Sequence, residues 1–169
     1  EQATELQAFL EWNARPETRF YRYDYYRDNC STRVRDALDR VLGGQIREQT
    51  EALPTGETYR THTERLTAGD ALLYAGLLIG LGQPVDREVS AWEEMFLPME
   101  MRSWAREITI LDEAGATVPL VRAEETVYLA PTDDGGVPEN APARFAGYLF
   151  VGVMLGVYLV RRITVNGLY

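Results

Sequence analysis

The sequence predicts an α+β domain that is mainly helical, with a short β-hairpin and a C-terminal transmembrane helix. Apolar residues recur at helical spacing in several segments, which favours amphipathic helices. One later segment alternates on both sides of a turn, which favours a hairpin. Residues 145–160 carry no charge, which favours a helix in an apolar environment. The expected organisation is an extracytoplasmic domain over residues 1–131, a linker over 132–142, a transmembrane helix over 143–162 and a cytoplasmic tail over 163–169.

The first two elements are expected to be a helix and a strand. Residues 4–14 have one apolar face, and Thr4 is a suitable N-cap for them. In residues 20–26 tyrosines recur at every second position. A period of two with a high aromatic content is typical of a strand, so we predict one here.

A second amphipathic helix is expected directly after Asn29. Apolar residues follow helical spacing as far as residue 42, where a Gly-Gly pair ends the segment. Asn29 is a favourable N-cap, so Cys30 is expected to be the first helical residue. The polar residues 45–67 that follow are predicted to be irregular.

Three further helices and the hairpin complete the expected domain. Residues 70–82 are apolar on nearly all sides but too short to span a bilayer, which predicts a buried helix. Ser90 heads a capping box before another helix, and Pro98 begins a third. Residues 108–121 are predicted to form the hairpin, with its turn at residues 113–116.

The charge balance and the scarcity of Cys and His exclude several classes of function. The chain has 17 basic residues, all Arg, against 26 acidic ones. Its net charge of -9 argues against nucleic acid as a partner, because phosphate binding needs clustered cations. A single cysteine cannot form an internal disulfide, and a single histidine excludes a metal site built from several His and Cys ligands. No metal and no cofactor is therefore predicted.

The C-terminal segment 143–162 has features of a membrane anchor. It ends in Arg161 and Arg162, which predicts that its C-terminal end faces the cytoplasm. Gly152 and Gly156 stand one helical turn apart and would let a second helix approach closely. We expect an inner-membrane protein with a periplasmic main domain, which contacts membrane lipid and the subunits of a transmembrane complex. The alternative is a buried core helix.

Cys30 has two interpretations. At a helix start, unpaired backbone N–H groups and the helix dipole stabilise a thiolate, and Arg27 and Arg33 add positive charge nearby. A strand, a capped turn and a Cys at a helix start is also the layout that papain-like enzymes use to present a nucleophile. In the other interpretation, Cys30 lies four residues before Val34, continues the apolar stripe and is a small buried residue.

The stretch YRYDYYRDNCSTRVRDAL, residues 21–38, resembles the signature of the bacterial family called the Lnb N-terminal periplasmic domain. Residues 28–32, with the sequence DNCST, are its most specific part, and weaker similarity extends over residues 1–105. This family is believed to relate to the permuted papain-like superfamily, which includes NlpC-type cysteine amidases. The resemblance implies a papain-like fragment, the C-terminal part of the domain only, with Cys30 at the nucleophile position and Asn29 as its cap.

An enzyme of this kind needs a histidine, and in the permuted arrangement it precedes the cysteine. No His precedes Cys30 in this sequence. His62 follows it among polar residues, where it is either a weak candidate base or an exposed loop residue. The start EQATEL has neither a Met nor an apolar signal segment, so we expect an internal fragment or a processed N-terminus.

Three functions remain open at this point, of which the third is a soluble ligand-binding domain with a hydrophobic last helix. The first is a membrane-anchored periplasmic accessory or structural subunit, non-catalytic in this form, which packs its helix against a larger membrane complex such as a photosynthetic or respiratory one. The second is a papain-like cysteine amidase, peptidase or acyltransferase, with Cys30 as nucleophile and a histidine supplied from upstream sequence.

Overall fold

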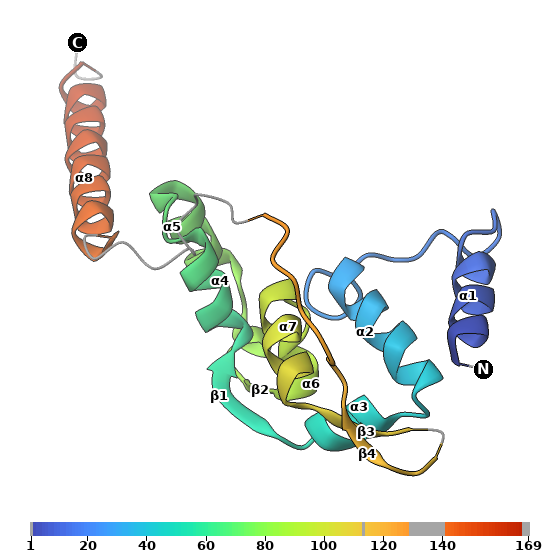
Figure 1. The fold of residues 1–169 in the computed structure, drawn as a ribbon. Coiled ribbons are helices and arrows are strands. Elements are labelled where there is room, and N and C mark those ends of the chain that lie inside the picture. Colours follow the sequence, from blue (N-terminus) through green and yellow to red (C-terminus); the bar gives the residue numbers. More distant parts are fainter. Residues whose placement is uncertain (1, 113, 129–140, 167–169) are drawn as a thin grey trace. The chain divides into compact units, whose positions relative to one another are not determined.

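A computed structural model of the chain describes residues 2–112, 114–128 and 141–166 (Figure 1). The chain divides into two compact units, each described here by itself. The first comprises Glu1–Tyr59 and Arg87–Leu129, and the second comprises Arg60–Asp86 and Ala130–Tyr169. The described part is mainly helical with two small antiparallel sheets, so the predicted α+β class is confirmed.

The helices of the first unit are α1 (Gln2–Asn13), α2 (Cys30–Val41), α3 (Gln45–Thr50), α6 (Ala91–Glu94) and α7 (Pro98–Glu107). Its strands are β1 (Pro54–Thr58), β2 (Glu88–Ser90), β3 (Thr109–Leu111) and β4 (Thr117–Pro119). The first sheet pairs β1 with β2 and has an irregular register; the second pairs β3 with β4 as a regular hairpin. The predicted hairpin is therefore confirmed, with its turn between Leu111 and Thr117.

An apolar cluster lies where α2, α3 and α6 meet. Its buried members are Val41, Leu42, Ile46, Trp92, Met95 and Ile108. The hairpin is attached to α3 by polar side chains: Gln49 donates to the carbonyl of Thr109 at 2.8 Å, and Gln45 accepts from the amide of Leu111 at 2.7 Å. The core thus brings α2 together with α6, and these two helices position the candidate site.

Two elements of the first unit differ from the sequence prediction. Residues 20–26 form no regular strand; the carboxylate of Asp24 instead accepts from the amides of Tyr26 and Arg27, both at 3.0 Å, and makes a turn. Residues 45–67 are not irregular, because they contain α3, β1 and α4 (Tyr59–Thr67). The predicted start of the first helix at Thr4 is also wrong, since α1 begins at Gln2.

The second unit contains most of α4, with α5 (Ala71–Gly80), the 3₁₀ turn η1 (Gln83–Val85) and α8 (Ala141–Asn166). Asp70 caps α5, because its carboxylate accepts from the amides of Leu72 and Leu73. The prediction of a buried helix here is wrong, since no residue of α5 is buried and Leu72 and Ile79 are 84% and 87% exposed. An all-apolar sequence predicts the helix, but it does not provide neighbours for every face.

The predicted C-terminal segment 143–162 lies within α8, so its helical conformation is confirmed. In the described residues, no helix combines the length and the apolar character that a membrane span requires. The transmembrane part of the prediction is therefore not supported. Most of the predicted linker, and residues 167–169 of the predicted tail, lie outside the described residues.

One carboxylate at the surface of the first unit has a strongly altered pKa. Glu124 accepts hydrogen bonds from Arg106 at 2.7 and 2.8 Å and from Arg102 at 2.7 Å. These bonds, with the Arg106 contribution the larger, lower the pKa of Glu124 from 4.5 to about 2. Because the folded-state pKa is depressed, the attachment of residue 124 to α7 is complete above pH 4.5 and is lost as the pH falls through about 2.

We expect an NMR titration of the Glu124 carboxyl carbon to show a midpoint near pH 2, and Arg106→Gln to move that midpoint toward 4.5. Arg122→Gln removes the same charge two residues from Glu124 and is the matched control. A wild-type midpoint close to 4.5 would show that neither arginine holds the carboxylate in solution.

Candidate functional site

Asn29 organises the start of α2 and is itself 5% exposed. Its side-chain oxygen accepts from the amides of Ser31 at 2.8 Å and Thr32 at 2.9 Å, which confirms the predicted N-cap. Its side-chain nitrogen, Nδ2, donates to two backbone carbonyl groups, those of Tyr25 at 2.8 Å and Phe96 at 2.9 Å. One side chain therefore begins the helix and also connects it to the residues that follow α6.

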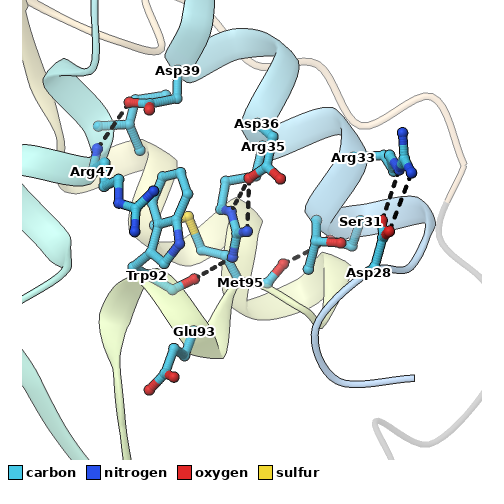
Figure 2. Close-up of polar contacts among 12 residues, drawn as sticks. Asp28, Ser31, Arg33, Arg35, Asp36, Asp39, Arg47, Trp92, Glu93 and Met95 are labelled. Atoms are coloured by element: carbon cyan, nitrogen blue, oxygen red, sulfur yellow. Dashed lines mark hydrogen bonds and ion pairs between the residues drawn. The ribbon is translucent and has the colours of Figure 1, made fainter. Parts of the chain in front are cut away.

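The two residues after Cys30 extend this connection. Ser31 donates from its hydroxyl to the carbonyl of Met95 at 2.8 Å (Figure 2). Thr32 accepts from the amide of Asn29 at 2.8 Å, which completes a capping box. Both side chains are buried, so the polar residues around the cysteine form a fixed structural frame.

Arg35 connects α2 directly to α6. It is 6% exposed and donates to the carbonyl of Trp92 at 2.7 Å, and also to Asp36 at 2.7 and 2.9 Å. Its guanidinium carbon lies 3.8 Å from the centroid of the Trp92 ring, and that of Arg47 lies 5.3 Å from it. Figure 2 shows the indole between these two guanidinium groups. This buried arginine was not predicted from the sequence.

Asp28 and Arg33 form an ion pair beside the cysteine, with distances of 2.7 and 3.1 Å (Figure 2). The hydrogen bond to Asp28 raises the pKa of Arg33. The guanidinium of Arg33 also lies over the ring of Tyr21, 4.0 Å from its centroid. Arg33 is thus held by two neighbours rather than being a mobile surface cation.

Cys30 is the first residue of α2 and, unlike the side chains on either side of it, is exposed. The interpretation of Cys30 as a small buried residue is therefore wrong. The thiol lines a cavity of about 410 Å³ between α1 and α2, whose walls are mainly apolar and include Phe9, Leu10 and Val34. No His, Asp or Glu is among the residues that line it. The geometry offers an accessible thiol and an apolar surface, without a histidine or a carboxylate from this cavity.

His62 lies in α4 and belongs to the second unit, whereas Cys30 belongs to the first. It is 4% exposed, and its Nδ1 lies 3.4 Å from a guanidinium nitrogen of Arg65. The alternative of an exposed loop histidine is therefore wrong. Its pairing with Cys30 stays a prediction.

Other predicted site residues lie in α8. An added Cβ at Gly152 or Gly156 would meet no atom within 4 Å, so the structure places no packed neighbour at either position. Arg161 and Arg162 lie in the last turns of the same helix. Within the described ranges, no group of three or more His, Cys, Asp and Glu side chains is placed to hold a metal ion.

Comparison with known proteins supports the family resemblance of the segment around Cys30. No curated protein and no solved structure matches this sequence. Residues 2–65 match the family model described as the Lnb N-terminal periplasmic domain. The match includes every residue of α2 and its cap, and it ends earlier than the predicted similarity to residue 105. It supports the resemblance carried by the DNCST motif and indicates a periplasmic domain family for this part of the chain.

Proposed function

We propose that the chain is a periplasmic accessory subunit of a larger membrane complex and that it binds this complex through α8. The observation that carries the proposal is the exposure of the helix: large apolar side chains between residues 148 and 158 are 54–67% exposed. They are Tyr148, Leu149, Phe150, Val151, Val153, Met154, Leu155, Val157 and Tyr158. Apolar surface of this extent is costly in water and marks interaction sites.

The two glycines of α8 give this surface a preferred face. Gly152 and Gly156 lie on the same side of the helix, one turn apart, and neither has a neighbour that a Cβ would contact. A partner helix can approach most closely at such a pair, because no side chain separates the two backbones. A transmembrane or interfacial helix of the host complex is the partner that this face fits.

The subunit is non-catalytic in this proposal. The cavity next to Cys30 is lined by no His, Asp or Glu, the side chains that most often transfer the protons needed for acyl transfer to or from an amine. The motif around the cysteine instead has a structural role, since Asn29, Ser31 and Arg35 connect α2 to the residues of α6 and its end.

The glycine face is tested by Gly152→Leu combined with Gly156→Leu. We expect this pair to lower co-purification of the chain with its membrane complex in mild detergent by about tenfold or more, because the added side chains hold the two helices apart. Leu is a better helix former than Gly, so α8 itself is retained. Gly147→Leu is the matched control, since position 147 lies about 140° around the helix from position 152.

A native chain that elutes as a monomer under these conditions would contradict the accessory role. Equal losses for the double variant and for Gly147→Leu would contradict the assigned face.

A second candidate function rests on the accessible thiol. In this alternative the chain is the cysteine-bearing part of a papain-like amidase, peptidase or acyltransferase, and it represents the C-terminal part of that domain. Cys30 is the nucleophile, and the base is a histidine from upstream sequence or His62. The exposure of Cys30, at the first position of α2 and beside an apolar cavity, favours this role.

Replacement of Cys30 distinguishes the two candidates. If the thiol is a nucleophile, Cys30→Ala in the full natural protein lowers the rate of p-nitrophenyl butyrate hydrolysis by about 10³-fold. Iodoacetamide is then also expected to label the wild-type thiol near neutral pH. Val34→Ala, which changes the same cavity but keeps the thiol, is the matched control and retains measurable hydrolysis. Unchanged hydrolysis in Cys30→Ala, or a thiol that does not react, argues for the non-catalytic subunit.

A further inference from the structure

The first unit contains a second cavity, of about 550 Å³, which includes neither Cys30 nor α8. Its lining comes from both sequence segments of the unit, the one that ends at residue 59 and the one that begins at residue 87. Its volume lies within the range of about 300–1,000 Å³ that is usual for small-molecule sites. The functions proposed above leave this cavity without a role.

Charged side chains dominate the cavity. Four arginines line it, although the chain as a whole has a net charge of -9: Arg27, Arg35, Arg47 and Arg87. Three carboxylates line it as well: Glu51, Glu88 and Glu93. The cavity therefore presents both signs of charge in nearly equal number.

Most of these groups hold one another in fixed positions. Arg47 donates to Glu51 at 3.0 Å, and Arg87 donates to Glu93 at 2.8 Å. The hydrogen bond from Arg87 lowers the pKa of Glu93. Such pairs shape the walls and leave little charge for a ligand.

Two charged side chains at the cavity have no ion-pair partner in the described part of the chain. The guanidinium of Arg27 has no hydrogen-bond or ion-pair partner among the described residues; only its backbone amide is bonded, to Asp24. Glu88 uses one carboxylate oxygen to accept from the amide of Gly56 at 2.8 Å, while its second oxygen has no donor in the described part of the chain. The site thus offers one available cation and one available anion.

Hydrophobic walls complete the cavity. The ring centroids of Tyr26 and Tyr59 lie 4.5 Å apart, and both residues line the cavity together with Pro54. Burial is the main cause that raises the pKa of Tyr59. A ligand therefore meets unpaired charge at Arg27 and Glu88 and aromatic surface at Tyr26 and Tyr59.

From this arrangement we infer that the cavity binds a short zwitterionic peptide, with its carboxylate at Arg27 and its ammonium group at Glu88. A phosphate ion at Arg27 would face the unpaired carboxylate of Glu88, and a simple cation at Glu88 would face the unpaired guanidinium of Arg27. A peptide with both charges and an apolar body avoids either conflict. The volume suits a ligand larger than a single small amino acid.

Isothermal titration calorimetry with the dipeptide Ala-Ala tests this site. The wild-type chain is expected to bind Ala-Ala, and to bind N-acetyl-Ala-Ala and Ala-Ala amide about 10- to 100-fold more weakly, because each cap removes one charge-assisted hydrogen bond. Arg27→Gln and Glu88→Gln are each expected to weaken Ala-Ala binding by a similar factor. Both residues are exposed, so the fold is retained. Arg22→Gln changes an exposed arginine outside the cavity and is the matched control.

Three results would overturn the inference. The first is the absence of Ala-Ala binding at about 10 mM peptide, because a dissociation constant above this concentration is too weak for a specific site. The second is equal binding of the capped peptides and Ala-Ala. The third is inorganic phosphate that binds more tightly than Ala-Ala and still more tightly in Glu88→Gln, since this result would identify an anion site.

Discussion

Replacement of Arg35 by alanine is expected to lower the free energy of unfolding by about 3 kcal/mol. The buried carbonyl of Trp92 loses its charged donor at 2.7 Å, and a loss of this kind costs about 1–3 kcal/mol. The cation–π contact with the Trp92 ring, at 3.8 Å, adds about 1 kcal/mol, and the buried aliphatic stem adds packing. Asp36 contributes little, because its side chain is 52% exposed and can be rehydrated.

Urea unfolding followed by tryptophan fluorescence measures this loss. Arg47→Ala is the matched control: Arg47 also lies over Trp92, but at 5.3 Å, and its side chain is 54% exposed, so we expect a loss below about 1 kcal/mol. Arg35→Lys keeps the charge without the planar fork and is expected to fall between the two. Equal losses for Arg35→Ala and Arg47→Ala would mean that the buried bond to the carbonyl contributes nothing.

Asn29→Ala is expected to lower the free energy of unfolding by about 2–3 kcal/mol. Loss of the N-cap accounts for about 1 kcal/mol of this. The remainder comes from the carbonyl of Phe96, which loses a donor at 2.9 Å and stays in a buried position.

Asn29→Ser separates the two contributions. Serine retains the N-cap but is too short to replace the amide donor, so this variant should recover about 1 kcal/mol of the loss in Asn29→Ala. Asn13→Ala provides the comparison for a local bond, since Asn13 donates only to the carbonyl of Phe9 within its own helix. If Asn29→Ser is as unstable as Asn29→Ala in thermal unfolding, the cap has no energetic role.

Local signals in the sequence were sufficient for several elements. The cap at Asn29 and the capping box at Ser90 depend on residues within one helical turn, and both are confirmed. The hairpin of β3 and β4 likewise depends on a short alternating segment around a turn. Each of these signals describes contacts between neighbours in the chain, which is why they could be recognised without the fold.

The polar contacts of α2 could not be predicted in the same way. The apolar spacing placed Val34 on the buried face, yet Val34 is 53% exposed and the adjacent Arg35 is 6% exposed. The reason is that the acceptor of Arg35, the carbonyl of Trp92, lies 57 residues away in sequence. No local pattern in the sequence indicates that a distant carbonyl will be available as an acceptor. An arginine beside an apolar stripe is therefore interpreted as a surface residue.

The three bonds from α2 to the carbonyls of Trp92, Met95 and Phe96 also bear on how the first unit folds. Helix α6 spans only Ala91–Glu94, and a helix of one turn has no stability by itself because nucleation is unfavourable. The carbonyl of Trp92 in α6, and those of the two residues that follow the helix at 95 and 96, obtain their donors from side chains of α2 and its N-cap. The stability of α6 therefore depends on α2, from which it is separated in sequence by a segment that contains the whole of residues 60–86.

The entropy of closing a flexible loop grows only with the logarithm of its length, so that each doubling costs about 0.6 kcal/mol. The segment between β1 and β2 can consequently differ in length with little effect on the stability of the first unit. The loss of a single hydrogen-bond donor at the start of α2, in contrast, affects both sequence segments of this unit, the one before and the one after that insertion.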